Sequence, residues 1–257
     1  MNRPLCVAFG LVLLVGHASA AEIHVVSSGG FAAAYKQLAP EFEKQTGNTL
    51  DSAWGPSMGD TRDAVPQRLA RGEPIDVVIM VAYALDQLAQ QGKVIPDSRR
   101  ELARSVIGVA VKAGAPKPDI STPDALKDAL LNAKSIAYSD SASGVYVQNV
   151  LLKKLGIAEE VRGKAHMIPA EPVGQVVARG DAEIGFQQIS ELKSVKGIDI
   201  IGPLPDSLQQ VTIFSAGIPV GAKQPEAAKQ LIEFLASPAA ADAIRDSGME
   251  PIATEKR

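Results

Sequence analysis

The stretch from Ser135 to Gly156 constrains the fold more than any other part of the sequence. It opens with the apolar run Ile136 to Tyr138, passes through the small residues SDSASG, and then carries apolar residues at helical spacing. This pattern predicts a strand, a turn and a helix in direct succession. The first amide groups of a helix lack partners within it and carry partial positive charge, so the turn is suited to binding an anion. The alternative is that Ser141 or Ser143 only caps the helix.

The same succession recurs along the chain. Residues 21–27 are predicted to form a strand, followed by a Ser/Gly turn and a helix that ends at Gly47 and is kinked or broken at Pro40. Residues 74–80 and 105–112 are predicted strands that contain the apolar runs VVIM and VIGVAV, which are typical of strands covered on both faces. Because strands and helices alternate throughout, we predict an α/β fold with mainly parallel sheets flanked by helices.

Four turns rich in Ser, Gly, Thr or Gln follow predicted strands. They lie at residues 27–30, 55–61, 139–146 and 187–190. Ligands of open α/β sheets bind beyond the carboxyl ends of the strands. The four turns therefore indicate one cleft whose ligand is held mainly by neutral donors.

The first 20 residues are a segment of another kind. Arg3 precedes an apolar run at residues 7–15, and the small-residue pattern before Ala21 predicts a signal peptide cleaved after Ala20. We therefore expect an exported, periplasmic protein with no membrane insertion once the signal is removed. The one cysteine of the sequence, Cys6, falls within this segment, which excludes thiol chemistry from the mature chain. The formal net charge of −3 gives no electrostatic reason to expect nucleic acid as a partner.

Several segments together resemble a known family. The strings VVSSGGFAAAYKQLAPEFEKQTG, GEPIDVVI, SDSASGVYVQNVLLKKLG and SPAAADAI occur here in the order and spacing of the type II periplasmic substrate-binding proteins, in particular their molybdate-binding branch. The resemblance covers nearly the whole mature chain. It implies two α/β lobes with the ligand cleft between them, one lobe formed by residues 21–104 with 213–257 and the other by 105–212. It also implies a monomer, with a small anionic molecule as ligand and an ABC transporter permease as the partner of a binding-only protein.

Departures from that branch predict a different ligand. Molybdate binders hold the oxyanion with a serine in the first turn, a serine in the second loop, a second-lobe turn amide and a tyrosine. Gln187 or Gln188 stands where the tyrosine is expected, and the second loop is longer and carries Asp60 and Arg62. An Arg fork and extra donors suit an organic anion with several carboxylates. The predicted ligand-binding residues are Ser28, Gly29, Gly30, Ser57, Thr61, Arg62, Ser141, Ser143, Gly144, Gln187 and Gln188.

Within that branch the sequence is also similar to the aconitate isomerases. This resemblance implies a periplasmic isomerase that moves a proton along an allylic system without metal, nucleotide or other cofactor. The alternative is a solute-binding protein that delivers a tricarboxylate or a molybdate-like oxyanion to a transporter. The isomerase needs a general base and donors for the developing charge.

Three side chains are candidates for this chemistry. We predict Tyr146 and Ser143 as catalytic residues, although a tyrosine at the start of a helix commonly packs in the core. Glu191 is a second candidate base, with the ordinary role of a first-turn acid as the alternative. Trp54 is expected either to wall the cleft or to pack in the core.

Overall fold

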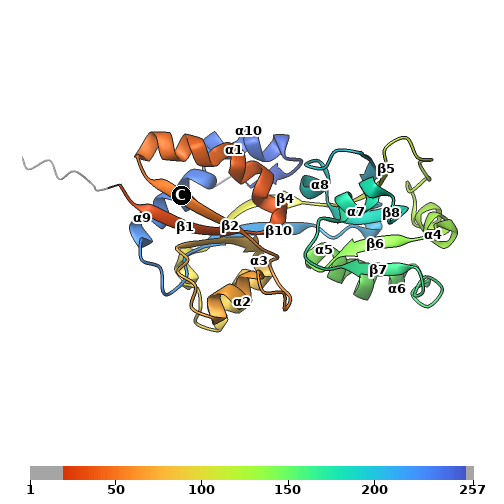
Figure 1. Ribbon diagram of the computed structural model, residues 1–257, viewed down its shortest axis with the longest axis horizontal. Coiled ribbons are helices and arrows are strands. Elements are labelled where there is room, and N and C mark those ends of the chain that lie inside the picture. Colours follow the sequence, from red (N-terminus) through yellow and green to blue (C-terminus); the bar gives the residue numbers. More distant parts are fainter. Residues whose placement is uncertain (1–19, 253–257) are drawn as a thin grey trace, which may run out of the picture.

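The structure, a computed structural model, describes residues 20–252 and forms two α/β lobes side by side (Figure 1). The predicted signal peptide lies outside the described residues except for Ala20, as do residues 253–257. Among residues 20–252, no helix combines the length and apolar character needed to cross a bilayer. The predicted two-lobed α/β fold is confirmed.

The first lobe is built on a six-stranded sheet with the order β11-β4-β10-β3-β1-β2. Its strands are β1 (Glu22–Ser27), β2 (Thr49–Trp54), β3 (Val77–Val81), β4 (Arg100–Ser105), β10 (Thr212–Gly217) and β11 (Glu250–Pro251). Its helices are α1 (Gly29–Thr46), α2 (Val65–Ala70), α3 (Ala82–Gln90), α9 (Pro225–Leu235) and α10 (Ala241–Asp246), with short 3₁₀ turns at Pro96–Ser98 and Pro238–Ala240.

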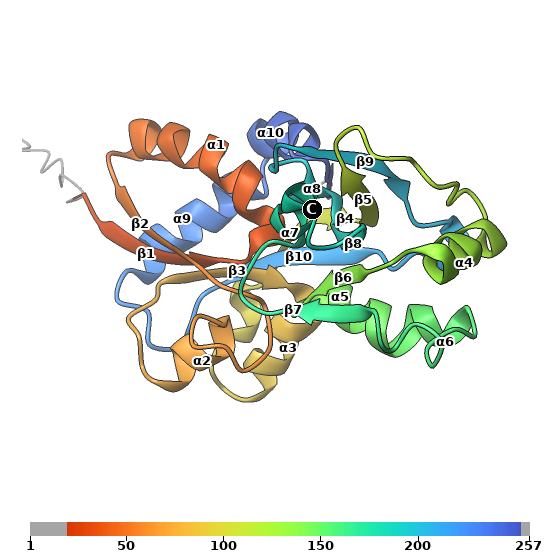
Figure 2. The same ribbon diagram turned by 45° about the vertical axis from the view of Figure 1, so that its right-hand side comes forward.

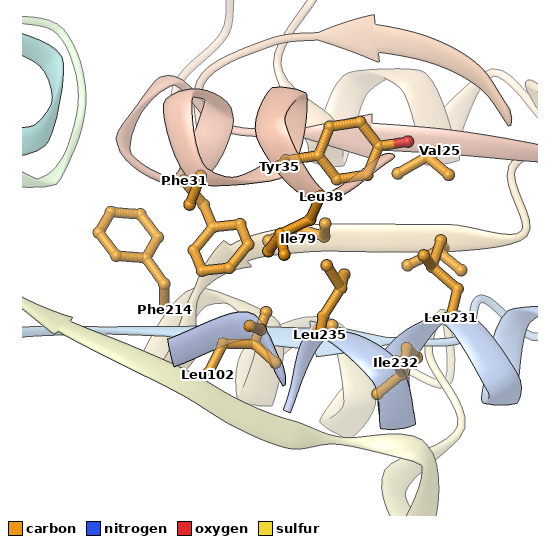
Figure 3. Close-up of a cluster of buried hydrophobic side chains, with 14 of the residues drawn as sticks. Val25, Phe31, Tyr35, Leu38, Ile79, Leu102, Phe214, Leu231, Ile232 and Leu235 are labelled. Carbon is orange, nitrogen blue, oxygen red and sulfur yellow. The ribbon is translucent and has the colours of Figure 1, made fainter. Parts of the chain in front are cut away.

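The core of this lobe lies on both faces of the sheet. On one face, Phe31 and Tyr35 from α1 pack with Leu231 and Leu235 from α9 over the strands (Figure 3). On the other face a smaller cluster from α2 and α3 covers β3. β3 alternates between the two clusters along its length, which explains why its sequence is apolar throughout.

The second lobe is built on a five-stranded sheet with the order β7-β6-β8-β5-β9. Its strands are β5 (Ile107–Lys112), β6 (Ile136–Ser139), β7 (Ala165–Ile168), β8 (Ile184–Gln188) and β9 (Ile198–Pro203). Its helices are α4 (Pro123–Asn132), α5 (Ala142–Tyr146), a π-helical turn at Val147–Leu151, α6 (Leu152–Lys154), α7 (Val173–Arg179) and α8 (Ile189–Leu192), with a 3₁₀ turn at Asp206–Leu208.

Both sheets are mixed, whereas mainly parallel sheets were predicted. β1 runs parallel to β2 and β3, but β10 runs antiparallel to β3 and β4. In the second lobe β5 is antiparallel to both of its neighbours. β10 and β5 are the strands at which the chain enters one sheet directly from the other, and the short C-terminal strand β11 also runs antiparallel to β4.

The predicted strand at residues 105–112 is β5 from Ile107 onward, and its first residue, Ser105, belongs to a different strand in the other lobe. β4 ends at Ser105 and β5 begins at Ile107. β4 and β9 were not predicted, and α1 continues through Pro40 without a break. The sequence of β4, RELARS, hides the strand because charged residues occupy its exposed positions.

The two connections between the lobes lie together. Thr212 at the start of β10 is opposite Ser105 at the end of β4. The side chain of Gln209 accepts a hydrogen bond from the Ile107 amide at 2.9 Å and donates one to the Ile107 carbonyl at 3.0 Å. These bonds join the two connecting segments as neighbouring strands would be joined. The exact residues at which the lobes divide stay a prediction.

Candidate functional site

A cleft of about 260 Å³ lies between the lobes, and all four predicted turns contribute to it. The first turn and the second loop form the first-lobe wall, while the turns after β6 and β8 form the other. α8 of the second lobe lies beside the N-terminal end of α1 at this cleft (Figure 2). A larger hollow of about 520 Å³ lies between α4 and β5, but residues of the second lobe alone line it.

The first turn presents Ser28 and the N-terminus of α1 to the cleft. The Ser28 amide donates to the Ile79 carbonyl at 2.8 Å, which fixes the turn beyond the end of β1. Ser28 is 3% exposed, and its Oγ has no hydrogen-bond partner. Phe214 packs so closely beneath Gly30 that a Cβ there would collide with its ring. The turn therefore combines an unpartnered hydroxyl with the free amides at the start of a helix.

The second loop adds two hydroxyls and an aromatic wall. Ser57 is fully buried, and its Oγ accepts a hydrogen bond from the Val81 amide at 3.0 Å. The hydroxyl proton of Ser57 is thus free for another acceptor. Thr61 also lines the cleft, with its Oγ1 unpartnered. Trp54 both lines the cleft and packs edge-on against Tyr35, with ring centroids 5.8 Å apart.

The turn after β6 is held together by serine contacts. Ser139 Oγ and Ser143 Oγ are 3.0 Å apart, and the Gly144 amide donates to Ser139 Oγ at 3.3 Å. A Cβ on Gly144 would collide with the Ser139 carbonyl, so this close approach requires glycine. Ser141 and Ser143 line the cleft, whereas Gly144 lies behind them with its amide directed to Ser139.

Both glutamines at the end of β8, Gln187 and Gln188, line the cleft. Gln188 Nε2 donates to Thr212 Oγ1 at 2.9 Å, and its buried Oε1 has no partner. Gln187 Nε2 donates to Glu191 Oε1 at 3.0 Å. Gln187 therefore holds the carboxylate of Glu191, one helical turn further along the chain.

Glu191 reaches across the cleft from α8 toward the first lobe. Its Oε1 lies where a Cβ of Gly29 would be, so the absence of a side chain on Gly29 makes room for it. Burial raises the pKa of Glu191 to about 7, and the negative charge of Asp140 adds to the rise. Hydrogen bonds from Gln187 and the Gln188 backbone act in the opposite direction. At neutral pH this carboxyl group can both accept and return a proton.

The other carboxylates that line the cleft each have an ion pair or a backbone hydrogen bond. Asp63 pairs with Arg68 at 3.1 Å, and Glu171 pairs with Arg179. Asp140 accepts a hydrogen bond from the Ala170 amide at 3.0 Å, and Ala170 holds a left-handed backbone with φ 55°. No Lys, Arg or His side chain is among the described residues that line the cleft. An anion there would be bound by neutral hydroxyls and amides.

Besides Gly144, two predicted site residues lie outside the cleft lining. The side chain of Tyr146 is buried in the second-lobe core, where its hydroxyl donates to the Leu208 carbonyl at 2.8 Å. This position corrects its expected place in the cleft, because the hydroxyl is satisfied within the core. Arg62 is exposed and does not line the cleft, and its carbonyl accepts from Arg71.

The structure also adds residues to the predicted cleft. Asp63, Asp140 and the loop Ala170–Pro172 line it but were not among the predicted ligand-binding residues. The sequence offered little signal for the loop, because it comes from a separate connection after β7. Within residues 20–252, no group of three or more His, Cys, Asp or Glu side chains is gathered as metal ligands would be.

Comparisons with known proteins agree with this architecture. A family model described as bacterial extracellular solute-binding protein matches residues 23–250. An aconitate isomerase of a Pseudomonas species is 54% identical over 228 residues, which cover 89% of this chain and 87% of that protein. The molybdate-binding protein ModA of Azotobacter vinelandii is 28% identical over 255 residues, 95% of this chain and 96% of that protein.

A solved structure has the same fold. The periplasmic molybdate-binding protein of Azotobacter vinelandii matches with a TM-score of 0.65 at 22% identity, covering 91% of this chain and 100% of that one. The resemblances predicted from the sequence, to the molybdate-binding branch and to aconitate isomerases, are confirmed.

Proposed function

The chain belongs to the bacterial extracellular solute-binding proteins, and from this premise we propose that it is an aconitate isomerase. It interconverts trans-aconitate and cis-aconitate in the cleft between its lobes. The observation that carries this proposal is the high identity to a Pseudomonas aconitate isomerase over most of both chains. The cleft supports it, because it offers several hydroxyl donors and, in Glu191, a carboxyl group without an ion pair in a small volume.

The chemistry is an allylic shift. A proton leaves the methylene carbon of the substrate, and the electron pair of the broken C–H bond forms a new double bond to the central carbon. The electrons of the old double bond move toward the far carboxylate, and the far carbon then receives a proton. The protein must hold three carboxylates, remove and return a proton, and stabilise the enolate-like charge.

Donors from both lobes are proposed to hold the carboxylates. Ser28 Oγ and the first amides of α1 face one part of the cleft, with Ser57 beside them. Ser143 faces the cleft from the second lobe, where we assign it to stabilise the developing charge rather than to move the proton. An anion here would be held by neutral donors, because no Lys, Arg or His is among the described residues that line the cleft.

The second candidate is a binding protein without catalysis. It is favoured by the family, whose members include molybdate-binding relatives, and would deliver a tricarboxylate or an oxyanion to a membrane transporter. In either case we propose that the protein is exported to the periplasm, in keeping with the predicted signal peptide.

A direct assay separates the two candidates. Purified mature protein is incubated with trans-aconitate, and the two isomers are separated by chromatography over time, while Trp54 fluorescence reports binding of aconitate, citrate and molybdate. The isomerase produces cis-aconitate until the two isomers reach equilibrium, at a rate proportional to protein concentration. If any of these anions binds but no isomer forms, the isomerase proposal is rejected and the protein is a binding protein for transport.

A further inference from the structure

Among the described residues, four carboxylates line the cleft, and Glu191 is the one that has no ion pair and whose carboxylate packs against the opposite lobe, at Gly29. Asp63 and Glu171 are neutralised by arginines, and Asp140 is tied to the backbone of the loop after β7. The side-chain partner of Glu191 is the amide of Gln187. A proton carrier must be free to exchange a proton without breaking an ion pair, and Glu191 meets that condition.

We propose that Glu191 is the catalytic base, which takes the methylene proton of aconitate and returns a proton to the former vinyl carbon. This assignment rests on the proposed isomerase function. The step is balanced: the carboxylate accepts a proton as the C–H bond breaks, the double bond moves by one carbon, and the same carboxyl group then protonates the far carbon. No oxidant, reductant or cofactor is consumed.

The geometry around Glu191 supports this role. Its carboxylate lies against Gly29, next to the first amides of α1 and to Ser28. A substrate carboxylate bound by those donors would place its neighbouring carbon beside Glu191. Gln187 acts as a positioning residue, since its amide fixes Oε1 and its own Oε1 is within 3.4 Å of the Gly174 amide.

The charged groups that face Glu191 tune its proton affinity. Asp140 contributes an unneutralised negative charge from the turn after β6, whereas Asp63 and Glu171 are compensated by Arg68 and Arg179. The first turn of α1 has no acidic residue. With burial, these surroundings raise the pKa of Glu191 to about 7. A base with this pKa is half ionised near neutral pH and serves in both directions of the reaction.

The test compares Glu191→Gln with Glu233→Gln, which removes a carboxylate from the exposed face of α9. For each variant, kcat and KM are measured with trans-aconitate, binding is followed by Trp54 fluorescence, and exchange of the methylene protons with D₂O is followed separately. We expect Glu191→Gln to lose about 10²- to 10⁴-fold in both kcat and exchange while its Kd changes less than about threefold. Glu233→Gln should behave as the wild type.

A second variant tests whether the charge of Asp140 influences the proton affinity of Glu191. Asp140→Asn should move the acid limb of the kcat/KM profile to lower pH, because the charge that raises the pKa of Glu191 is removed. Circular dichroism and thermal unfolding establish that each variant is folded.

The outcomes distinguish the two levels of the proposal. If the wild type is active and Glu191→Gln keeps its kcat within about tenfold of wild type, or loses only binding, the assignment of Glu191 as the base is overturned. The proposed isomerase function would then still stand. A wild type that does not interconvert the isomers overturns the proposed function and the base together.

Discussion

The Glu191 carboxylate of the second lobe lies against the Cα of Gly29 in the first lobe, in the space that a side chain on Gly29 would occupy. The contact joins the N-terminus of α1 to α8 across the cleft. A titratable group thus sits at the meeting point of the two lobes, beside the donors that we assign to the substrate. Closure of the lobes and the protonation of Glu191 are expected to influence each other, because opening the cleft would hydrate the carboxylate.

Replacing Gly29 with alanine should impair activity without unfolding the protein. The new Cβ would push away Oε1 of Glu191, which is the end of a flexible side chain, and the backbone of Gly29 needs no positive φ. We expect a fall in kcat of at least about tenfold, with unfolding free energy unchanged or raised by up to about 1 kcal/mol. Gly163→Ala is the matched control, since a Cβ there meets open space. Equal kcat values for both variants would argue against a required position of Glu191.

The half-buried carboxyl group of Glu191 should make the unfolding free energy depend on pH. The folded protein holds the Glu191 proton up to about pH 7, whereas the unfolded chain releases it near the ordinary value of 4.5. This contribution to stability is present at low pH and is lost as the pH rises through about 7. Relative to wild type, Glu191→Gln should therefore gain about 3 kcal/mol of unfolding free energy between pH 4.5 and 7.5 in urea unfolding. A difference that stays constant over this range would contradict the burial of Glu191.

Substitutions of Ser28 and Ser57 should both weaken substrate binding but should affect the unfolding free energy differently. Ser28→Ala removes a buried hydroxyl without a partner, so the unfolding free energy should stay constant or rise by up to about 1 kcal/mol. Ser57→Ala leaves the buried Val81 amide without its acceptor and should cost about 1–3 kcal/mol. Both should raise KM for trans-aconitate about tenfold through a lost bond to a carboxylate. An unchanged KM in both variants would remove these serines from the binding site.

Tyr146→Phe tests the corrected position of that side chain. The variant loses the hydrogen bond to the Leu208 carbonyl in the core and should lose about 1–3 kcal/mol of unfolding free energy, because the buried carbonyl is left unpaired. Its kcat should remain within about twofold of wild type at temperatures where it is folded. A loss of kcat comparable to that of Glu191→Gln would return Tyr146 to the catalytic site.

Much of the fold was accessible from the sequence because its signals are local. The apolar run of β3 and the small-residue turn after β6 follow from burial on both faces of a sheet and from the close approach of Gly144 to Ser139. β9 escaped prediction because its residues are only half-buried and do not alternate clearly. The break between β4 and β5 is set by the passage of the chain from one lobe to the other, which no local pattern announces.

The cleft was predictable in outline but its key carboxylate was not. The four turns were found because each follows a strand, and each lines the cleft. The sequence ranked Glu191 only as a second candidate base, because the groups that surround it include Gly29 and Asp140, which are distant in sequence. Tyr146 was predicted as a catalytic residue because the sequence does not reveal that the Leu208 carbonyl accepts a hydrogen bond from the Tyr146 hydroxyl in the core.

The isomerase activity itself is tested most directly by proton NMR of trans-aconitate in D₂O with the purified mature protein. We expect the vinyl resonance of the trans isomer to fall while that of the cis isomer grows, with deuterium entering the methylene group and with turnover far exceeding the amount of protein. A spectrum that stays unchanged at high protein concentration, while Trp54 fluorescence reports that aconitate is bound, would contradict the proposed isomerase activity.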